Sequence, residues 1–361
     1  MTAITHFSAS YGEGRQKFLD AAKAAGAAIT THSHPGRGPD GGALATDVAH
    51  FGEKDAPNLF IATSATHGIE GFCGSGSMVG WMAEGLVRER PKGTAILLVH
   101  ALNPHGFAHE RRVTEDNVDL NRNFVDHARP YPVNAGYADL HAHLVPSAWD
   151  GAPRQTADQA IAAYIARHGH GAYQAAVTQG QYSHVDGLFF GGTAPTWSNR
   201  TWREILKTHA ARRRHVAVLD FHTGLGPRGY GEIQFERGPN DPEYLRLQSW
   251  FDGEATSPDD GSSSSAAISG YMASAVAEEC PDAVRSCFAV EYGTRPLDQV
   301  LDAVRADNWL YARGKVDSPL GRTIKRAIRD AFYGEDERWK TDVFERAVSV
   351  ARKTLRGLAG S

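Results

Sequence analysis

A histidine and a glutamate stand three residues apart where a short apolar segment of the chain ends. The stretch FIATSATHGIEGFCGSGS starts at Phe60 with small and apolar residues, and His67 and Glu70 follow at once. In a loop, side chains at positions i and i+3 can turn towards one point, and an imidazole and a carboxylate are common zinc ligands in hydrolytic sites. A surface turn is the alternative, because short H-x-x-E matches also arise by chance.

Ionisable residues also lie at the ends of other apolar segments. Four such segments, rich in β-branched residues, cover residues 58–65, 94–102, 215–222 and 285–293. Their near-continuous hydrophobicity is typical of central strands covered on both faces. The third segment ends in Asp220 and His222, and the fourth carries Glu291. Because ligands of open α/β sheets bind outside the carboxyl ends of the strands, we expect these groups to form one site.

His222 is the candidate for a third metal ligand. Two histidines and one carboxylate, with a position left open for water, form a standard catalytic zinc set. Strand alternation puts Asp220 on the same side as His222, so Asp220 could orient the imidazole from behind. The alternative is a half-buried histidine that only bonds to Asp220.

A second block, RRVTEDNVDLNRNF (residues 111–124), is rich in planar hydrogen-bond donors. These are Arg111, Arg112, Asn121, Arg122 and Asn123. Such groups suit a carboxylate or an oxyanion. The apolar residues among them indicate a segment packed against the protein, which favours an anionic partner for the arginines over a solvated surface run.

Helical patterns lie between the predicted strands. They cover residues 11–27, 77–90, 156–179 and 198–214, and most of 297–358. The alternation predicts an α/β fold with a mostly parallel sheet and helices on both faces.

The composition argues against several classes of partner. The 361 residues are 41% hydrophobic and 22% charged, and the net charge of −4 gives no electrostatic basis for binding nucleic acid or an anionic membrane. No apolar run is long enough to span a membrane, and the first residues lack the pattern of a secretory signal. Three cysteines are too few for a disulfide framework, so we expect buried thiols and a cytoplasmic protein.

The blocks HGIE, NPHGFAHERRVTEDNVDLNRNF, DFHTG and AVEYG resemble, in order and spacing, the zinc carboxypeptidase superfamily, which includes the succinylglutamate desuccinylase and aspartoacylase enzymes. The stretches GQYSHVDGLFFGG, HTGLGPRGYGE and DNWLYARG are similar to a bacterial branch of that superfamily, catalogued as a domain of unknown function. The resemblance implies a mixed, mostly parallel sheet in a single domain, residues 1–361. An insert at about 126–200 and a helical C-terminal part at about 297–358 would belong to this domain.

The resemblance also implies one zinc ion per chain, with His67, Glu70 and His222 as its ligands. Glu291 would take a proton from the zinc-bound water, as a general base. Arg112 would polarise the scissile carbonyl and stabilise the oxyanion.

Asn121 and Arg122 would hold the terminal carboxylate of the substrate. The spacing from Arg112 to Asn121 is short for large digestive carboxypeptidases, so Arg111 is an alternative to Arg112. A tyrosine that covers the substrate has no sure counterpart; Tyr271 and Tyr230 are the candidates.

The expected activity is hydrolysis of an amide bond next to a free carboxylate, by a metallocarboxypeptidase-type peptidase acting on a peptide or small-molecule substrate. The alternative enzyme is an N-acyl amino acid amidohydrolase or deacylase of the succinylglutamate desuccinylase-aspartoacylase type. A non-catalytic metal- or carboxylate-binding module is the alternative from another class, and the presence of all three ligands together with Glu291 disfavours it. The sequence does not determine which substrate side chain is preferred, whether a second metal ion binds, or the oligomeric state.

Overall fold

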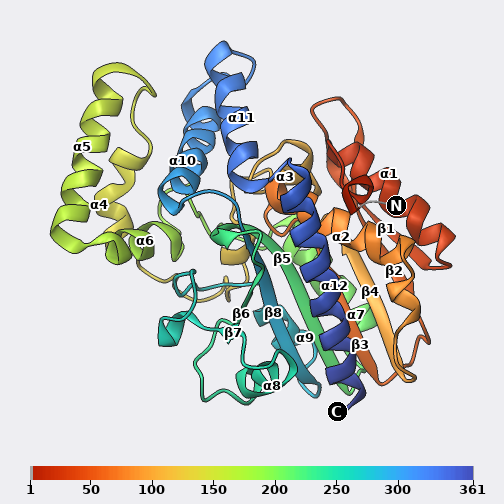
Figure 1. The fold of residues 1–361 in the computed structure, drawn as a ribbon. Coiled ribbons are helices and arrows are strands. Elements are labelled where there is room, and N and C mark those ends of the chain that lie inside the picture. Colours follow the sequence, from red (N-terminus) through yellow and green to blue (C-terminus); the bar gives the residue numbers. More distant parts are fainter. Residues whose placement is uncertain (1–2, 361) are drawn as a thin grey trace.

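The computed structural model describes residues 3–360 and is built around an eight-stranded sheet with the order β1-β2-β4-β3-β5-β8-β6-β7 (Figure 1). The strands are β1 (Ala28–Arg37), β2 (Ala43–Phe51), β3 (Asn58–Thr63), β4 (Thr94–His100), β5 (His215–Arg228), β6 (Glu232–Gln234), β7 (Ala255–Thr256) and β8 (Val284–Gly293). Strands β4, β3, β5 and β8 are parallel neighbours, as are β6 and β7, while β1–β2, β2–β4 and β6–β8 are antiparallel. The predicted mixed, mostly parallel sheet is confirmed.

Helices cover both faces of this sheet. The α-helices are α1 (Tyr11–Ala24), α2 (Gly71–Ala83), α3 (Pro104–Ala108), α4 (Ala135–Leu144), α5 (Gly151–His168), α6 (His170–Thr178), α7 (Trp197–His209), α8 (Pro242–Trp250), α9 (Ala273–Glu279), α10 (Leu297–Arg313), α11 (Pro319–Phe332) and α12 (Glu337–Ala359). Single 3-10 turns occur at η1 (Ala3–His6), η2 (Gly68–Glu70), η3 (Leu86–Arg88), η4 (Leu120–Arg122) and η5 (Pro258–Asp260).

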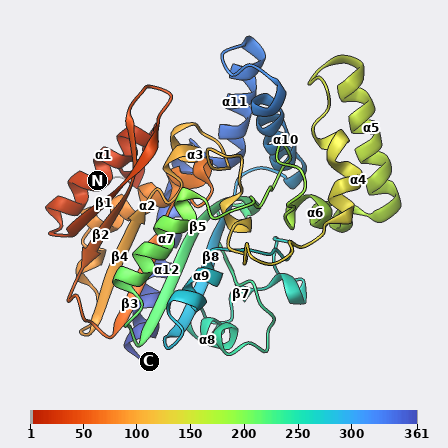
Figure 2. The same cartoon turned by 180° about the vertical axis from the view of Figure 1, so that it is seen from behind.

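Side chains of the central strands alternate between two apolar clusters. On β3, Phe60 packs into the cluster that holds residues of α1, α2 and α12, whereas Ile61 packs into the cluster of α7 and α9. Figure 1 shows α12 across one face of the sheet, and Figure 2 shows α7 across the other. Burial on both faces explains why these strands read as continuous apolar runs in the sequence.

The insert forms a group of helices, α4 to α6, beside α10 and α11 (Figures 1 and 2). Arg305 of α10 ties them together, because its Nε donates to Leu144 O at 3.1 Å and its Nη1 pairs with Asp158 at 2.6 Å. The single helix predicted over residues 156–179 is divided into α5 and α6. The break lies at Gly169, whose φ of +86° is costly in a helix for residues other than glycine.

The antiparallel hairpin of β1 and β2 was not predicted. β1 lies at the edge of the sheet and is mostly exposed, so its sequence AITTHSHPGR carries little hydrophobic signal. All three cysteines, Cys73, Cys280 and Cys287, are buried free thiols, as expected. Within residues 3–360, no helix combines the length and hydrophobicity needed to cross a membrane.

Candidate metal centre

The loop after β3 is shaped by close backbone packing. His67 is extended, and Gly68–Glu70 form the turn η2 that runs into α2. The amides of Gly68 and Ile69 donate to the carbonyls of Arg112 and Arg111 at 3.1 and 2.8 Å. A Cβ on Gly68 would stand 2.0 Å from the carbonyl carbon of Gly106, so only glycine fits. This packing fixes the direction in which His67 and Glu70 leave the backbone.

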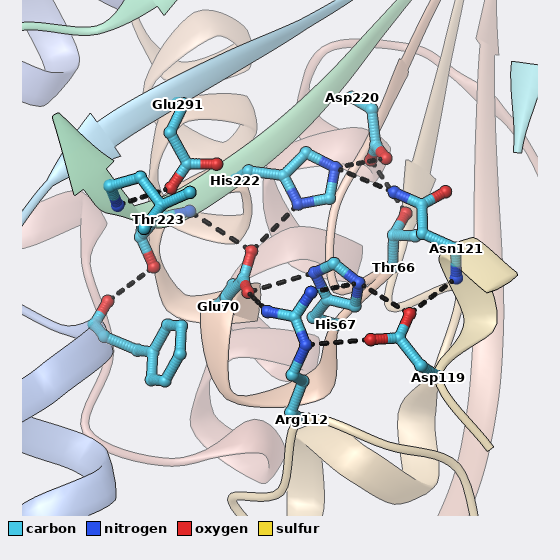
Figure 3. Close-up of polar contacts among 12 residues, drawn as sticks. Thr66, His67, Glu70, Arg112, Asp119, Asn121, Asp220, His222, Thr223 and Glu291 are labelled. Atoms are coloured by element: carbon cyan, nitrogen blue, oxygen red, sulfur yellow. Dashed lines mark hydrogen bonds and ion pairs between the residues drawn. The ribbon is translucent and has the colours of Figure 1, made fainter. Parts of the chain in front are cut away.

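His67, Glu70 and His222 converge on one point (Figure 3). His67 Nδ1 lies 3.0 Å from Glu70 Oε1, and His222 Nδ1 lies 2.9 Å from Glu70 Oε2. One donor atom from each of the three lies within 4.8 Å of the others, and all three residues are buried. His222 lies on β5, and His67 and Glu70 lie in the loop after the neighbouring parallel strand β3. We expected these residues to meet because the carboxyl ends of parallel strands lie at the same edge of a sheet.

Each imidazole is held from behind by a carboxylate. His67 Nε2 lies 3.1 Å from Asp119 Oδ1, and His222 Nε2 lies 2.7 Å from Asp220 Oδ2. A proton on Nε2 that is donated to the carboxylate leaves the Nδ1 lone pair free to bind a metal. The sequence pointed to Asp220 but missed Asp119, although an acidic residue between the apolar Val118 and Leu120 is a signal of a buried carboxylate.

The donor set fits a zinc ion. His67 Nδ1 is buried and makes no hydrogen bond, despite its 3.0 Å separation from Glu70. A buried nitrogen without a partner is costly unless another group satisfies it. Burial opposes the ionisation of Glu70, yet His67 and His222 hold its pKa well below the usual range. Two imidazoles and an ionised carboxylate form the set that catalytic zinc prefers.

Arg112 reaches into the centre and Arg111 does not. Nη1 of Arg112 pairs with Glu70 at 2.8 Å, and its Nε pairs with Asp119 at 2.9 Å (Figure 3). Arg111 instead pairs with Asp307 at 3.4 Å and lies over the Tyr311 ring. Consecutive side chains leave this segment in different directions, which favours Arg112 over Arg111 as the arginine that faces a substrate.

Asn121 and Arg122 come from η4 and line the same cavity as the candidate metal ligands. Asn121 Nδ2 lies 3.4 Å from His222 Nε2, and its Oδ1 accepts from Met272 N at 2.8 Å. Arg122 donates from Nε to Thr178 O at 3.0 Å and from Nη1 to Asn121 O at 3.0 Å. Tyr271 lines the cavity, whereas Tyr230 is 52% exposed and lies over Arg346.

Glu291 of β8 stands beside His222 in the register of the β5–β8 pair and lines the cavity. Its Oε1 accepts from Leu225 N at 2.8 Å. Burial, together with the charge of Glu70, raises the pKa of Glu291 to about 8. Arg295, the nearest arginine along the chain, bonds to Asp330 O. Glu291 is therefore available to a group bound in the cavity.

The cavity holds about 1240 Å³ of empty volume, including its open mouth. The sequence did not single out several residues of its wall, among them Gln174, Thr178, Phe189, Glu236, Val300 and Val304. They come from the insert, from the loop after β6 and from α10. Scattered apolar and polar residues on such segments have no shared spacing, which is why no sequence pattern could find them.

The α/β fold of the chain is carboxypeptidase-like. Bovine thrombin-activatable fibrinolysis inhibitor, in complex with tick carboxypeptidase inhibitor, is similar in structure, with 11% identity, a TM-score of 0.50 and coverage of 98% of each chain. Murein-tripeptide amidase from Escherichia coli O157 is 16% identical, with a TM-score of 0.35 and coverage of 82% of this chain and 94% of that chain. A Shewanella amazonensis protein described as succinylglutamate desuccinylase/aspartoacylase family is 20% identical, with a TM-score of 0.36 and coverage of 79% and 73%.

The chain belongs to the family described as "Protein of unknown function (DUF2817)", whose model matches residues 7–346. No curated protein sequence matches the chain. The resemblance predicted from the sequence is thus confirmed for the fold and for the family of unknown function.

Proposed function

We propose that the protein is a zinc-dependent hydrolase that cleaves an amide bond next to a free carboxylate, as a metallocarboxypeptidase-type peptidase. One observation carries this proposal. His67, Glu70 and His222 converge with both imidazoles held by carboxylates, and the unpaired side of Glu291 faces the same cavity. A structural metal site would not need a free carboxylate beside it.

A zinc ion bound there would polarise the substrate carbonyl and lower the pKa of a water molecule to about 7. Glu291 would take the proton of the attacking water and deliver it to the leaving amine. Arg112, whose guanidinium already lies beside Glu70 and Asp119, would stabilise negative charge developing on the carbonyl oxygen.

Asn121 and Arg122 would bind the carboxylate of the substrate, and Tyr271 would contact the bound molecule from the same wall. Arg122 keeps N–H groups beyond those bonded to Thr178 O and Asn121 O, because a guanidinium carries five donors. These roles place the scissile bond between the metal centre and the carboxylate site.

The alternative, an N-acyl amino acid amidohydrolase, is favoured by one contact at the cavity wall. Gln174 of α6 donates from Nε2 to Ser264 O at 3.2 Å, and both Gln174 and Thr178 line the cavity. The insert thereby limits the room on this side, which suits a short acyl group. A single domain, a cytoplasmic location and the absence of a nucleic-acid partner stay predictions.

The test is a comparison of Glu291→Gln with the unchanged protein, after both are loaded with zinc. Substrates are dipeptides and N-acyl amino acids with a free carboxylate. We expect Glu291→Gln to keep its zinc and lose about 10²–10⁴-fold in kcat, because the general base is removed. Glu204→Gln, on the exposed side of α7, is the matched control and should keep full activity. Equal turnover by Glu291→Gln would refute the assignment.

A further inference from the structure

Glu236 is a half-buried residue of the cavity wall, and one oxygen of its carboxylate is buried without a partner. It lies two residues beyond the end of β6, and it lines the cavity that holds the metal centre. Its Oε2 is shielded from solvent and unbonded, and within residues 3–360 its side chain makes no hydrogen bond or ion pair. A buried carboxylate oxygen without a hydrogen-bond partner is costly, which indicates that a ligand of the cavity satisfies it.

The other charged side chains of the cavity wall either bond to the protein or are already assigned to the attacking water and the substrate carboxylate. Arg237 pairs with Asp241 at 2.7 Å and also with Glu243, and Glu243 accepts from Cys287 N at 2.5 Å. Arg285 donates to Ala283 O at 3.3 Å. Around the metal centre the charged residues bond to one another, except Glu291, which accepts from Leu225 N and is assigned above to the attacking water. Apart from Glu291 and Arg122, which the proposed function already uses, Glu236 is the charged side chain left for a ligand among the described residues of the wall.

The surroundings of Glu236 connect it to the proposed substrate site. Burial raises the pKa of Glu236 to about 7, while the charge of Arg122 acts in the opposite direction. The charge of Glu236 in turn acts on Tyr271. Glu236 thus lies within electrostatic reach of Arg122, the proposed carboxylate-binding residue, and of Tyr271 in the same wall.

The path of the chain after β6 is consistent with the position of Glu236 in the cavity wall. β6 runs antiparallel to β8, with Glu232 opposite Glu291 and Gln234 opposite Ala289. The chain that leaves β6 at Gln234 therefore continues along the wall away from Glu291. Gln234 itself is occupied, since it donates to Ser264 Oγ at 3.2 Å and accepts from Ser265 Oγ at 3.2 Å. Glu236 is the next polar side chain along this path.

We propose that Glu236 binds a cationic group, an ammonium or guanidinium, on the side chain of the amino acid that the enzyme releases. The inference rests on the proposed function, because Arg122 and Asn121 would hold the α-carboxylate of the same amino acid. One negative and one positive site on the same wall match a substrate with a carboxylate and a cationic side chain. A charge-assisted hydrogen bond in a buried site is strong, so Glu236 would set the substrate preference.

The experiment uses the zinc-loaded protein and three substrates with the same acyl group and a C-terminal lysine, norleucine or glutamate. Norleucine has the lysine side chain without its ammonium. We expect kcat/KM for the lysine substrate to exceed that for norleucine by about 10–100-fold, with glutamate the poorest. Equal values for lysine and norleucine, or a preference for glutamate, would overturn the proposal.

Two variants sharpen the result. Glu236→Gln keeps the shape but not the charge, and it should abolish the preference for lysine while it leaves norleucine hydrolysis within about 3-fold. Asp259→Asn is the matched control, because this exposed residue also acts on Glu236 electrostatically but does not line the cavity. It should leave the preference unchanged. An unchanged preference in Glu236→Gln would exclude Glu236 as its source.

A binding measurement separates this proposal from the proposed function. Calorimetric titration of the zinc-loaded protein with free lysine and free norleucine should show tighter binding of lysine, by about 10-fold or more, that Glu236→Gln removes. Hydrolysis of norleucine substrates with no preference for lysine would leave the hydrolase standing and the role of Glu236 refuted. Preferential binding of lysine without hydrolysis of any amide would support Glu236 and refute the hydrolase.

Discussion

The imidazoles of His67 and His222 face one another with their ring centroids 4.9 Å apart, and each turns Nδ1 towards Glu70. Their Nε2 atoms point the opposite way, to Asp119 and Asp220. Two histidines from different strand ends thus direct the same ring nitrogen to Glu70 and the other to a carboxylate, although their ring planes are inclined at 55°. This shared orientation is what a bound metal ion requires of its ligands.

Asp220 should govern zinc affinity without touching the metal. Its Oδ1 accepts from Thr63 and Thr66 at 2.6 and 2.7 Å, which fixes the carboxylate that holds His222. Asp220→Asn is expected to weaken zinc binding about 10–100-fold, measured by competition with a chelator. Asp126→Asn removes an exposed carboxylate and should bind zinc as before. Unchanged affinity in Asp220→Asn would contradict the supporting role.

Gly68→Ala should disrupt the loop that carries His67 and Glu70. The new Cβ would stand 2.0 Å from the Gly106 carbonyl carbon, and backbone cannot move aside cheaply. We expect a loss of about 3 kcal/mol or more in the free energy of unfolding, measured with denaturant. Gly12→Ala is the control, because nothing lies within 4 Å of its Cβ in α1, and it should be neutral or slightly stabilising. An unchanged free energy of unfolding for Gly68→Ala would contradict the close contact between Gly68 and the backbone of Gly106.

His100 should make stability depend on pH. It is fully buried, its Nε2 lies 2.9 Å from Ser75 Oγ, and burial lowers its pKa to about 4. The pKa in the unfolded chain is about 6.5, so stability is complete above this pH and falls as the pH drops towards 4. Between about pH 7 and about pH 5 the protein should lose about 2 kcal/mol through this residue.

The measurement is the free energy of unfolding at both pH values for the unchanged protein and for His100→Gln. The variant no longer titrates at this position, so its loss between the two pH values should be smaller by about 2 kcal/mol. His168→Gln alters an exposed histidine at the end of α5 and should follow the unchanged protein. Parallel pH profiles for His100→Gln and the unchanged protein would remove His100 as the cause.

Arg122→Gln should act on substrate binding more than on turnover. If Arg122 holds the substrate carboxylate, KM for free-acid substrates rises by about 10–100-fold, and esterified substrates are much less affected. Arg111→Gln is the contrasting variant. It breaks the pair with Asp307 and should lower stability, but it should leave KM unchanged. Equal KM changes for acid and ester substrates in Arg122→Gln would contradict the carboxylate site.

The sequence predicted the structure best where buried strands end in residues that can bind a metal or transfer a proton. The central strands β3, β4, β5 and β8 are apolar on both faces, so their positions were predicted from hydrophobicity alone. Their polar ends gave His67, Glu70, His222 and Glu291 as one site, and the structure brings these residues together.

Features set by tertiary packing could not be predicted in this way. The edge strand β1 is polar and exposed, so it looked like a loop. The choice between Arg111 and Arg112 depends on which side chain turns inward, and neighbouring residues of one type are indistinguishable in a sequence. The proposed role of Glu236 depends on its unbonded Oε2 in the cavity wall, and whether a carboxylate finds a partner is a property of the folded chain.

Crystallography with data collected at the zinc absorption edge tests the metal centre most directly. After zinc is added to the protein, we predict one anomalous peak about 2 Å from Nδ1 of His67, Nδ1 of His222 and a carboxylate oxygen of Glu70. A zinc-saturated crystal with no peak between these residues, or with the imidazoles turned to bind through Nε2, would contradict the account.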